Sequence, residues 1–83
     1  MNTLFLLMAE YETADIPLRD VSEKYFGLSF RKACDKARTQ DLPVPVYRCG
    51  SQKSQLLVSA KDLADLIDER REAATRDRER LSA

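Results

Sequence analysis

The sequence contains no histidine and no tryptophan, and its only two cysteines are Cys34 and Cys49. Histidine is the commonest general base and metal ligand, so the main routes to acid–base and zinc chemistry are missing. Cys34 lies on an apolar stripe with no histidine to activate its thiol, which argues against a catalytic nucleophile. Two free thiols are a simpler expectation than a disulfide. We therefore predict no enzyme, no metal and no cofactor.

Glycine and long apolar runs are also scarce. With only Gly27 and Gly50, the chain has no glycine-rich phosphate loop. The apolar run at residues 4–9 is far too short to cross a bilayer and follows no basic segment of the kind that opens a signal peptide. At 83 residues, a single small domain buries about 60% of its unfolded surface, which argues against a deep catalytic cleft. These features predict a cytoplasmic protein with no membrane contact.

Charge is balanced overall but segregated along the chain. The sequence has 14 basic and 14 acidic residues. Residues 9–28 hold five acidic and two basic side chains, whereas residues 29–55 hold six basic and two acidic ones. A basic middle segment lets one face bind a polyanion while the whole molecule stays neutral.

The first predicted helix covers residues 3–12, with Thr3 as its cap. Its residues 4–8 are all apolar, and a helix without a polar face must be covered on several sides. Two interpretations stay open: a central core helix, or a helix that forms part of a homodimer interface.

Residues 17–40 predict a helix-turn-helix. Pro17, in the segment Asp15-Ile16-Pro17, is typical of a helix start, and Gly27 is suited to the left-handed conformation that ends a helix. Ser29 follows as the cap of a second helix over residues 30–40. Two short helices joined by a glycine-containing turn make this arrangement.

The second helix of the pair separates an apolar stripe from a basic face. Phe30, Ala33, Cys34 and Ala37 recur at helical spacing and predict close packing on the preceding helix. Cations that hold phosphates, mixed with side chains that read base edges, suit a helix in the major groove. The candidate DNA-binding residues here are Arg31, Lys32, Lys36, Arg38, Thr39 and Gln40.

A small hairpin is expected at residues 43–58. Residues 42–48 and 56–58 have strand character, and the polar turn between them bends at Gly50. A hairpin directly after the second helix matches the wing of a winged helix-turn-helix, although a wing without DNA contact is the alternative. The candidate DNA-binding residues of the wing are Arg48, Ser51, Gln52, Lys53 and Ser54.

A last helix is predicted over residues 60–80, with Ser59 as cap and Asp62 three residues later. Its apolar stripe thins beyond Arg70, where acidic and basic side chains alternate. This part of the helix is expected to project into solvent, to pair with the same segment of a partner, or to contact another protein.

These elements together predict a single DNA-binding domain over residues 1–83. Its fold class is α+β and mostly helical: a winged helix-turn-helix with an extra N-terminal helix and a long C-terminal helix. The order of elements is similar to that of excisionase and MerR-type DNA-binding domains.

Several stretches resemble the pyocin activator (PrtN) family. They are NTLFLLMA at 2–9, IPL at 16–18, YFGL at 25–28, LPVPV at 42–46, GSQKS at 50–54, LVSA at 57–60 and DLA at 62–64. The resemblance runs in order over residues 2–68. It implies a bacterial or prophage transcriptional activator that binds an upstream box and switches on bacteriocin genes, and it implies no catalytic residue. The DNA contacts named above come from the residues alone.

We therefore expect a homodimer that binds double-stranded DNA at two half-sites about one turn, ~10 bp, apart. Activation would need a second surface for RNA polymerase, and the charged helix at 60–80 is the exposed candidate. Two alternatives stay open. One is an excisionase-like architectural factor that bends DNA, and the other is a protein-binding adaptor or antirepressor that never contacts DNA.

Overall fold

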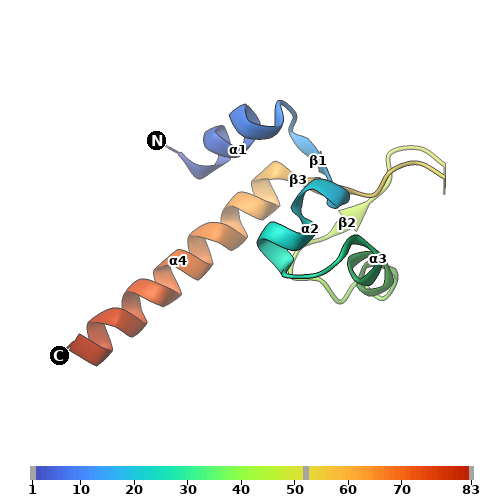
Figure 1. Ribbon diagram of the computed structural model, residues 1–83. Coiled ribbons are helices and arrows are strands. Elements are labelled where there is room, and N and C mark those ends of the chain that lie inside the picture. The colour runs from blue at the N-terminus through green and yellow to red at the C-terminus, as the bar shows by residue number, and fades with distance from the viewer. Residues whose placement is uncertain (1, 52, 83) are drawn as a thin grey trace.

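The computed structural model describes residues 2–51 and 53–82 (Figure 1). The elements in this part of the chain are α1 (Thr3–Tyr11), β1 (Asp15–Pro17), α2 (Leu18–Phe26), α3 (Phe30–Arg38), β2 (Val46–Tyr47), β3 (Leu57–Ser59) and α4 (Ala60–Ser82). The three strands form one antiparallel sheet in the order β1-β3-β2. The predicted α+β class, mostly helical, is confirmed.

Helix α1 lies at the surface and packs along the first half of α4 (Figure 1). Its cap is Asn2, whose side chain accepts a hydrogen bond from the Leu4 backbone N–H, so the prediction of Thr3 as cap is wrong. The Thr3 hydroxyl instead donates to the Asp68 carboxylate at 2.7 Å and ties α1 to α4. Leu7 is buried, whereas the Phe5 side chain is 64% exposed. Helix α1 therefore covers the core from one side and is not its central element.

The segment Asp15–Pro17 forms a strand that the sequence analysis did not predict, while Pro17 caps helix α2, so the predicted helix start near Pro17 is correct to within one residue. Ile16 is fully buried opposite Val58 of β3, and helix α2 begins one residue after Pro17. The Leu18 backbone N–H donates to the Leu56 carbonyl at 2.9 Å. A three-residue strand carries too little pattern to be recognised without its partner, which lies some 40 residues later in the sequence.

Helices α2 and α3 are joined by the turn that the sequence predicts. Gly27 has φ +66°, and its N–H donates to carbonyls of the last turn of α2. The Ser29 hydroxyl accepts a hydrogen bond from the Lys32 N–H at 3.3 Å and caps α3. The small side chains of Ala33 and Ala37 are buried, which lets the two helices pack closely.

Helix α3 ends at Arg38, two residues before its predicted end. Gln40 has φ +53°, a conformation that no helix contains. The Thr39 hydroxyl donates to the Lys36 carbonyl, and the Asp41 N–H donates to the same carbonyl at 2.9 Å. Thr39 and Gln40 therefore lie in the turn after α3, not on the helix as predicted.

Strand β2 is shorter than the segment 42–48 predicted for it, whereas β3 has its predicted length of three residues and is shifted by one residue. Pro43 and Pro45 lack the backbone N–H that a ladder needs, and pairing begins only at Val46. The central strand β3 places Val58 between Ile16 and Val46, and all three side chains are buried. The Tyr47 hydroxyl on β2 donates to the Asp15 carboxylate on β1, so the two outer strands also meet through side chains.

Helix α4 is long, and only its first half packs on the domain. Its buried side chains are Ala60, Leu63 and Ala64, and the Asp62 N–H donates to the predicted cap Ser59 at 3.4 Å. Residues 68–82 are exposed apart from Ala73, which is partly buried. The second half of the helix projects from the body (Figure 1). Within the described residues, no helix is long and apolar enough to cross a bilayer.

Candidate nucleic-acid interface

The outer surface of α3 carries the basic side chains that the sequence singles out. Arg31, Lys32, Lys36 and Arg38 are all exposed, while Ala33 and Ala37 face α2 and the core. The inner stripe thus lies where the periodicity predicts it. The helix therefore presents its cations to solvent.

Two of these four cations are paired with acidic neighbours. The Lys36 ammonium lies 3.4 Å from the Asp41 carboxylate, and Arg38 lies 3.7 Å from Asp35. Within residues 2–51 and 53–82, no carboxylate pairs with Arg31 or Lys32. Exposed ion pairs of this kind are worth about 0–1 kcal/mol, so a phosphate can replace either carboxylate at small cost.

The connection between β2 and β3 extends away from the body beside α3 (Figure 1). Arg48, Ser51 and Lys53 in this connection are exposed, and Ser54 is partly buried. The Ser51 hydroxyl accepts a hydrogen bond from the Lys53 N–H at 3.3 Å, and the Ser54 N–H donates to the Ser51 carbonyl at 2.9 Å. The candidate Gln52 lies outside the described residues.

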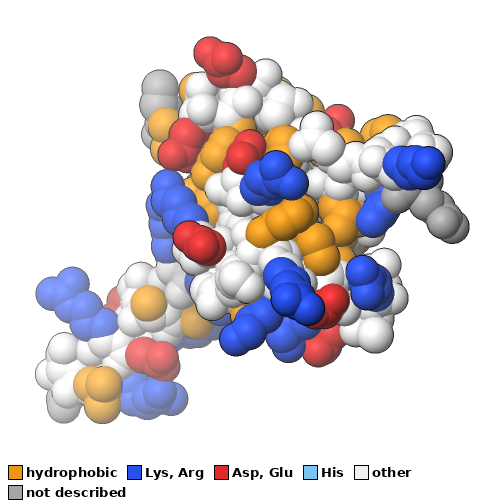
Figure 2. Space-filling view, turned by 45° about the vertical axis from the view of Figure 1, so that its right-hand side comes forward, with side chains coloured by type: hydrophobic (Ala, Val, Ile, Leu, Met, Phe, Trp, Pro, Cys, Tyr) orange, Lys and Arg blue, Asp and Glu red, His pale blue; other side chains and the backbone are white. Residues whose placement is uncertain are grey.

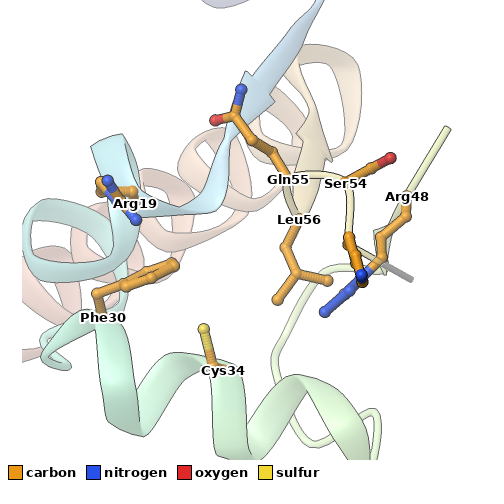
Figure 3. A pocket seen from close by; sticks show the side chains of 8 residues that line it. Arg19, Phe30, Cys34, Arg48, Ser54, Gln55 and Leu56 are labelled. Carbon is orange, nitrogen blue, oxygen red and sulfur yellow. The ribbon is translucent and has the colours of Figure 1, made fainter. Parts of the chain in front are cut away.

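A cavity of about 240 Å³ separates this connection from α2 and α3 (Figure 3). Arg19 and Phe30 form one wall and Arg48 and Leu56 the other, while the Cys34 thiol points into the space between them. The remaining lining residues are Lys53, Ser54 and Gln55. No acidic side chain is among the described residues that line it. Three cations therefore surround a partly apolar floor.

Arg19 is the residue that sequence reasoning missed. Its guanidinium carbon lies 4.7 Å from the centroid of the Phe30 ring, a cation–π distance. The charge pattern could not single it out, because Arg19 belongs to the acidic segment 9–28. Its position in the first turn of α2 brings it to the cavity only after α2 and α3 have packed together.

A second cavity continues the same surface toward the end of α3. It shares Cys34, Arg48 and Leu56 with the first cavity and adds Arg38 and Gln40. Figure 2 shows this side of the molecule, with basic side chains around an exposed hydrophobic patch and a few acidic ones among them. We call the residues lining the two cavities, together with Arg31 and Lys32, the basic face.

Lys36 does not share the cavities of the basic face. It lines a different groove with Tyr25, Phe26, Leu28 and Asp41, none of which lines either cavity beside the hairpin. Lys36 and Lys53, which the sequence places on one surface, thus lie on different flanks of α3. The basic face therefore includes most of the candidates that the sequence names, adds Arg19, and leaves out Lys36.

The comparison with protein families decides the identity of the chain. A family model described as pyocin activator protein PrtN matches residues 3–74. The chain belongs to the pyocin activator protein PrtN family. The match runs from α1 through the middle of α4, so it includes the whole of the basic face, and it confirms the resemblance found in the sequence. No curated protein and no solved structure matches the chain.

Membership of the PrtN family makes the chain a member of a regulatory family and not of an enzyme family. This agrees with the residue types that meet at the basic face: cations, amides, hydroxyls and aromatic or aliphatic carbon. Such side chains bind a polyanion through charge and hydrogen bonds.

Proposed function

We propose that this PrtN-family protein regulates pyocin genes by binding double-stranded DNA as a winged helix-turn-helix. Helix α3 enters the major groove, and the connection between β2 and β3 acts as the wing on the adjacent backbone. The observation that carries the proposal is the cavity where Arg19, Arg48 and Lys53 converge beside the exposed cations of α3.

The geometry of α2 and α3 supports this arrangement. The turn at Gly27 sets α3 against α2 through Ala33 and Ala37, which leaves the opposite surface of α3 free to enter a groove. The major groove of B-DNA, about 12 Å wide, admits one α-helix. Arg31 and Lys32 lie in the first turn of α3, where a helix-turn-helix contacts base edges.

The cavity supplies the contact that orients the protein on the duplex. A backbone phosphate seated there would be reached from α2 by Arg19 and from the hairpin by Arg48 and Lys53. The Phe30 ring and the Leu56 side chain offer apolar contact for a deoxyribose. Phosphate contacts of this kind set register and orientation, while the side chains of α3 read sequence.

Transcriptional activation needs a further contact with the transcription machinery. The predicted RNA polymerase contact of α4 stays a prediction, since it rests only on the exposed, charged surface of residues 68–82.

Binding to duplex DNA tests the proposal directly. Selection of bound duplexes from a random pool should enrich a specific sequence, and affinity for that sequence should fall with salt at a log–log slope of roughly −3 to −8. Arg31→Glu should weaken binding strongly, whereas Arg76→Glu, an equal change of charge on the projecting half of α4, should not.

Each remaining outcome has a distinct interpretation. A flat salt response, or equal effects of the two variants, would overturn DNA binding through the basic face. Strong bending in circular-permutation gel shifts would favour the architectural alternative. Absence of any shift together with stable co-purification of a protein partner would favour the adaptor.

A further inference from the structure

The projecting half of α4 ends in an exposed apolar side chain. Leu81 is 84% exposed, the highest exposure of any large hydrophobic side chain in the described residues. Its neighbour Arg80 forms an ion pair within the helix with Asp77 at 2.7 Å. Such pairs hold a helix together by a few tenths of a kcal/mol each and leave Leu81 uncovered.

A groove lies where the same helix leaves the body. It has a volume of about 390 Å³, and its lining includes Tyr25, Leu66 and Ile67, whose side chains are partly buried. Lys24, Arg70, Arg71 and Ala74 form its rim. The Lys24 ammonium is held 3.3 Å from the Glu10 carboxylate of α1, so this side of the groove is anchored to the body. An apolar side chain fits against the floor of the groove.

Leu81 and Ile67, which lines the groove, lie on one stripe of α4, and each is seven residues from Ala74. Ile67, Ala74 and Leu81 are seven residues apart, and a straight helix drifts only about 20° over seven residues. Each step of seven residues rises about 10.5 Å. A two-fold axis beside Ala74 would therefore bring Leu81 of each copy over Ile67 of the other.

We infer that two copies of this chain associate through an antiparallel pairing of their α4 helices about Ala74, with Leu81 of each copy seated in the groove of the other. Such a surface is self-complementary, as a two-fold interface requires. The small side chain of Ala74 at the crossing allows close approach of the helix backbones.

The charges beside the stripe have defined partners in this pairing. On one flank, Arg70 of each copy lies next to Asp77 of the second copy, and symmetry creates this contact twice. On the other flank Arg71 lies near Arg78 of the second copy, where both long side chains are exposed and extend into solvent. The apolar contacts therefore stabilise the dimer, and the two Arg70–Asp77 contacts favour the antiparallel orientation of the α4 helices.

A second copy is the occupant because one chain carries both complementary features. Phe5, Leu6 and Met8 of α1 are also exposed, but they do not lie on the stripe of α4 that carries both Leu81 and the groove. The pairing uses one stripe of a single helix in each copy, which is less than the roughly 20–30 residues per partner of a standard interface, so we expect an association in the micromolar range.

Cysteine cross-linking tests the geometry. In a full-length background carrying Cys34→Ser and Cys49→Ser, Ala74→Cys should form a disulfide-linked dimer of about 19 kDa from chains of 9.5 kDa under mild oxidation. Thr75→Cys, one residue further and turned by about 100° around the helix, is the matched control and should cross-link at least ten-fold less. Equal cross-linking of the two variants would overturn the pairing.

Sedimentation equilibrium tests the energetics in the full chain without added DNA. Leu81→Asp and Ala74→Glu should each weaken association at least ten-fold, while Thr75→Glu should not, and helical circular dichroism should be unchanged in all three. Arg70→Asp and Asp77→Arg should each weaken the dimer, and the double variant should restore it. Dissociation by Phe5→Asp but not by Ala74→Glu would assign the interface to α1 and refute the proposal.

The inference does not depend on DNA binding. Leu81→Asp should give a monomer that still binds a single half-site with the affinity of one wild-type subunit. A chain that dimerises but binds no DNA would refute the proposed function alone, and a monomer that binds DNA would refute the dimer alone.

Discussion

The guanidinium carbon of Arg19 lies 4.7 Å from the centroid of the Phe30 ring and so joins the first turn of α2 to the first turn of α3. Both side chains line the cavity that also receives Arg48 and Lys53 from the hairpin. The stacking holds a planar guanidinium at the edge of the basic face, and this group is suited to the phosphate contact that we propose.

Replacement of Arg19 separates its charge from its stacking. Arg19→Ala should lower DNA affinity several-fold and reduce the log–log salt slope by roughly 1, because one phosphate contact is lost. Arg19→Lys should keep the slope and lose part of the affinity. The melting temperature should fall little in either variant, because an exposed cation–π contact stabilises the fold by only about 0.5–1 kcal/mol. Fluorescence anisotropy across a salt series measures both effects, and an unchanged slope in Arg19→Ala would remove Arg19 from the interface.

Charge reversal at Lys53 and at Lys36 should have unequal effects on DNA binding. Lys53 lines the cavity with Arg19 and Arg48, whereas Lys36 is paired with Asp41 at 3.4 Å on the other flank of α3. Lys53→Glu should therefore weaken binding more than Lys36→Glu, although both change the charge equally. The free energy of unfolding, measured by thermal melts, should differ from wild type by less than about 1 kcal/mol in each variant. A larger loss of affinity in Lys36→Glu would show that DNA lies on the opposite flank.

Gly27→Ala should destabilise the fold through its backbone alone. Gly27 has φ +66°, and a Cβ built there meets no atom within 4 Å, so only the left-handed conformation penalises a side chain. The expected loss is about 1–2 kcal/mol. Gly50→Ala is the matched control, because among the described residues that Cβ would meet the movable Ser54 hydroxyl and the Ser54 Cβ. Urea unfolding of both variants measures the difference, and an equal loss at both glycines would contradict it.

Tyr47 should make the domain lose stability as the pH rises above 10. Burial, followed by the hydrogen bond to Asp15, raises the pKa of Tyr47 from 10.0 to about 12. Between pH 10 and 12 the unfolded chain therefore binds fewer protons than the folded chain. The contribution of Tyr47 is complete below pH 10 and is lost as the pH rises toward 12.

Comparison with Tyr47→Phe isolates this contribution. Urea unfolding at pH 8 and pH 11 should show a larger loss of stability in wild type than in Tyr47→Phe, because the phenylalanine has no proton to lose. The same loss in both proteins would show that Tyr47 titrates normally.

The segment of α2, the turn at Gly27 and α3 was predictable because its signals are local. Gly27 ends α2 and Ser29 caps α3 through hydrogen bonds that span at most five residues along the chain. Ala33 and Ala37 are buried as their spacing predicts. The predicted end of α3 lies two residues beyond the observed one, because the polar residues Thr39 and Gln40 follow Arg38 directly, with no glycine or proline to stop the helix.

Pairing over long sequence distances was not predictable in the same way. Strand β1 has three residues, and its extended conformation depends on Val58 and Leu57 of β3. Likewise, Thr3 is a good cap by residue type, but its hydroxyl is used by Asp68 of α4.

The amino-acid sequence by itself determined the family, the pair of helices α2 and α3 with the turn between them, and the basic surface of α3, because periodicity and capping operate over a few neighbouring residues. Tertiary structure alone decided that Arg19, from an acidic segment, joins Arg48 and Lys53 around one cavity while Lys36 stands apart. Which charges meet depends on how helices and hairpin pack, and packing energy comes from contacts between residues that are distant in the chain.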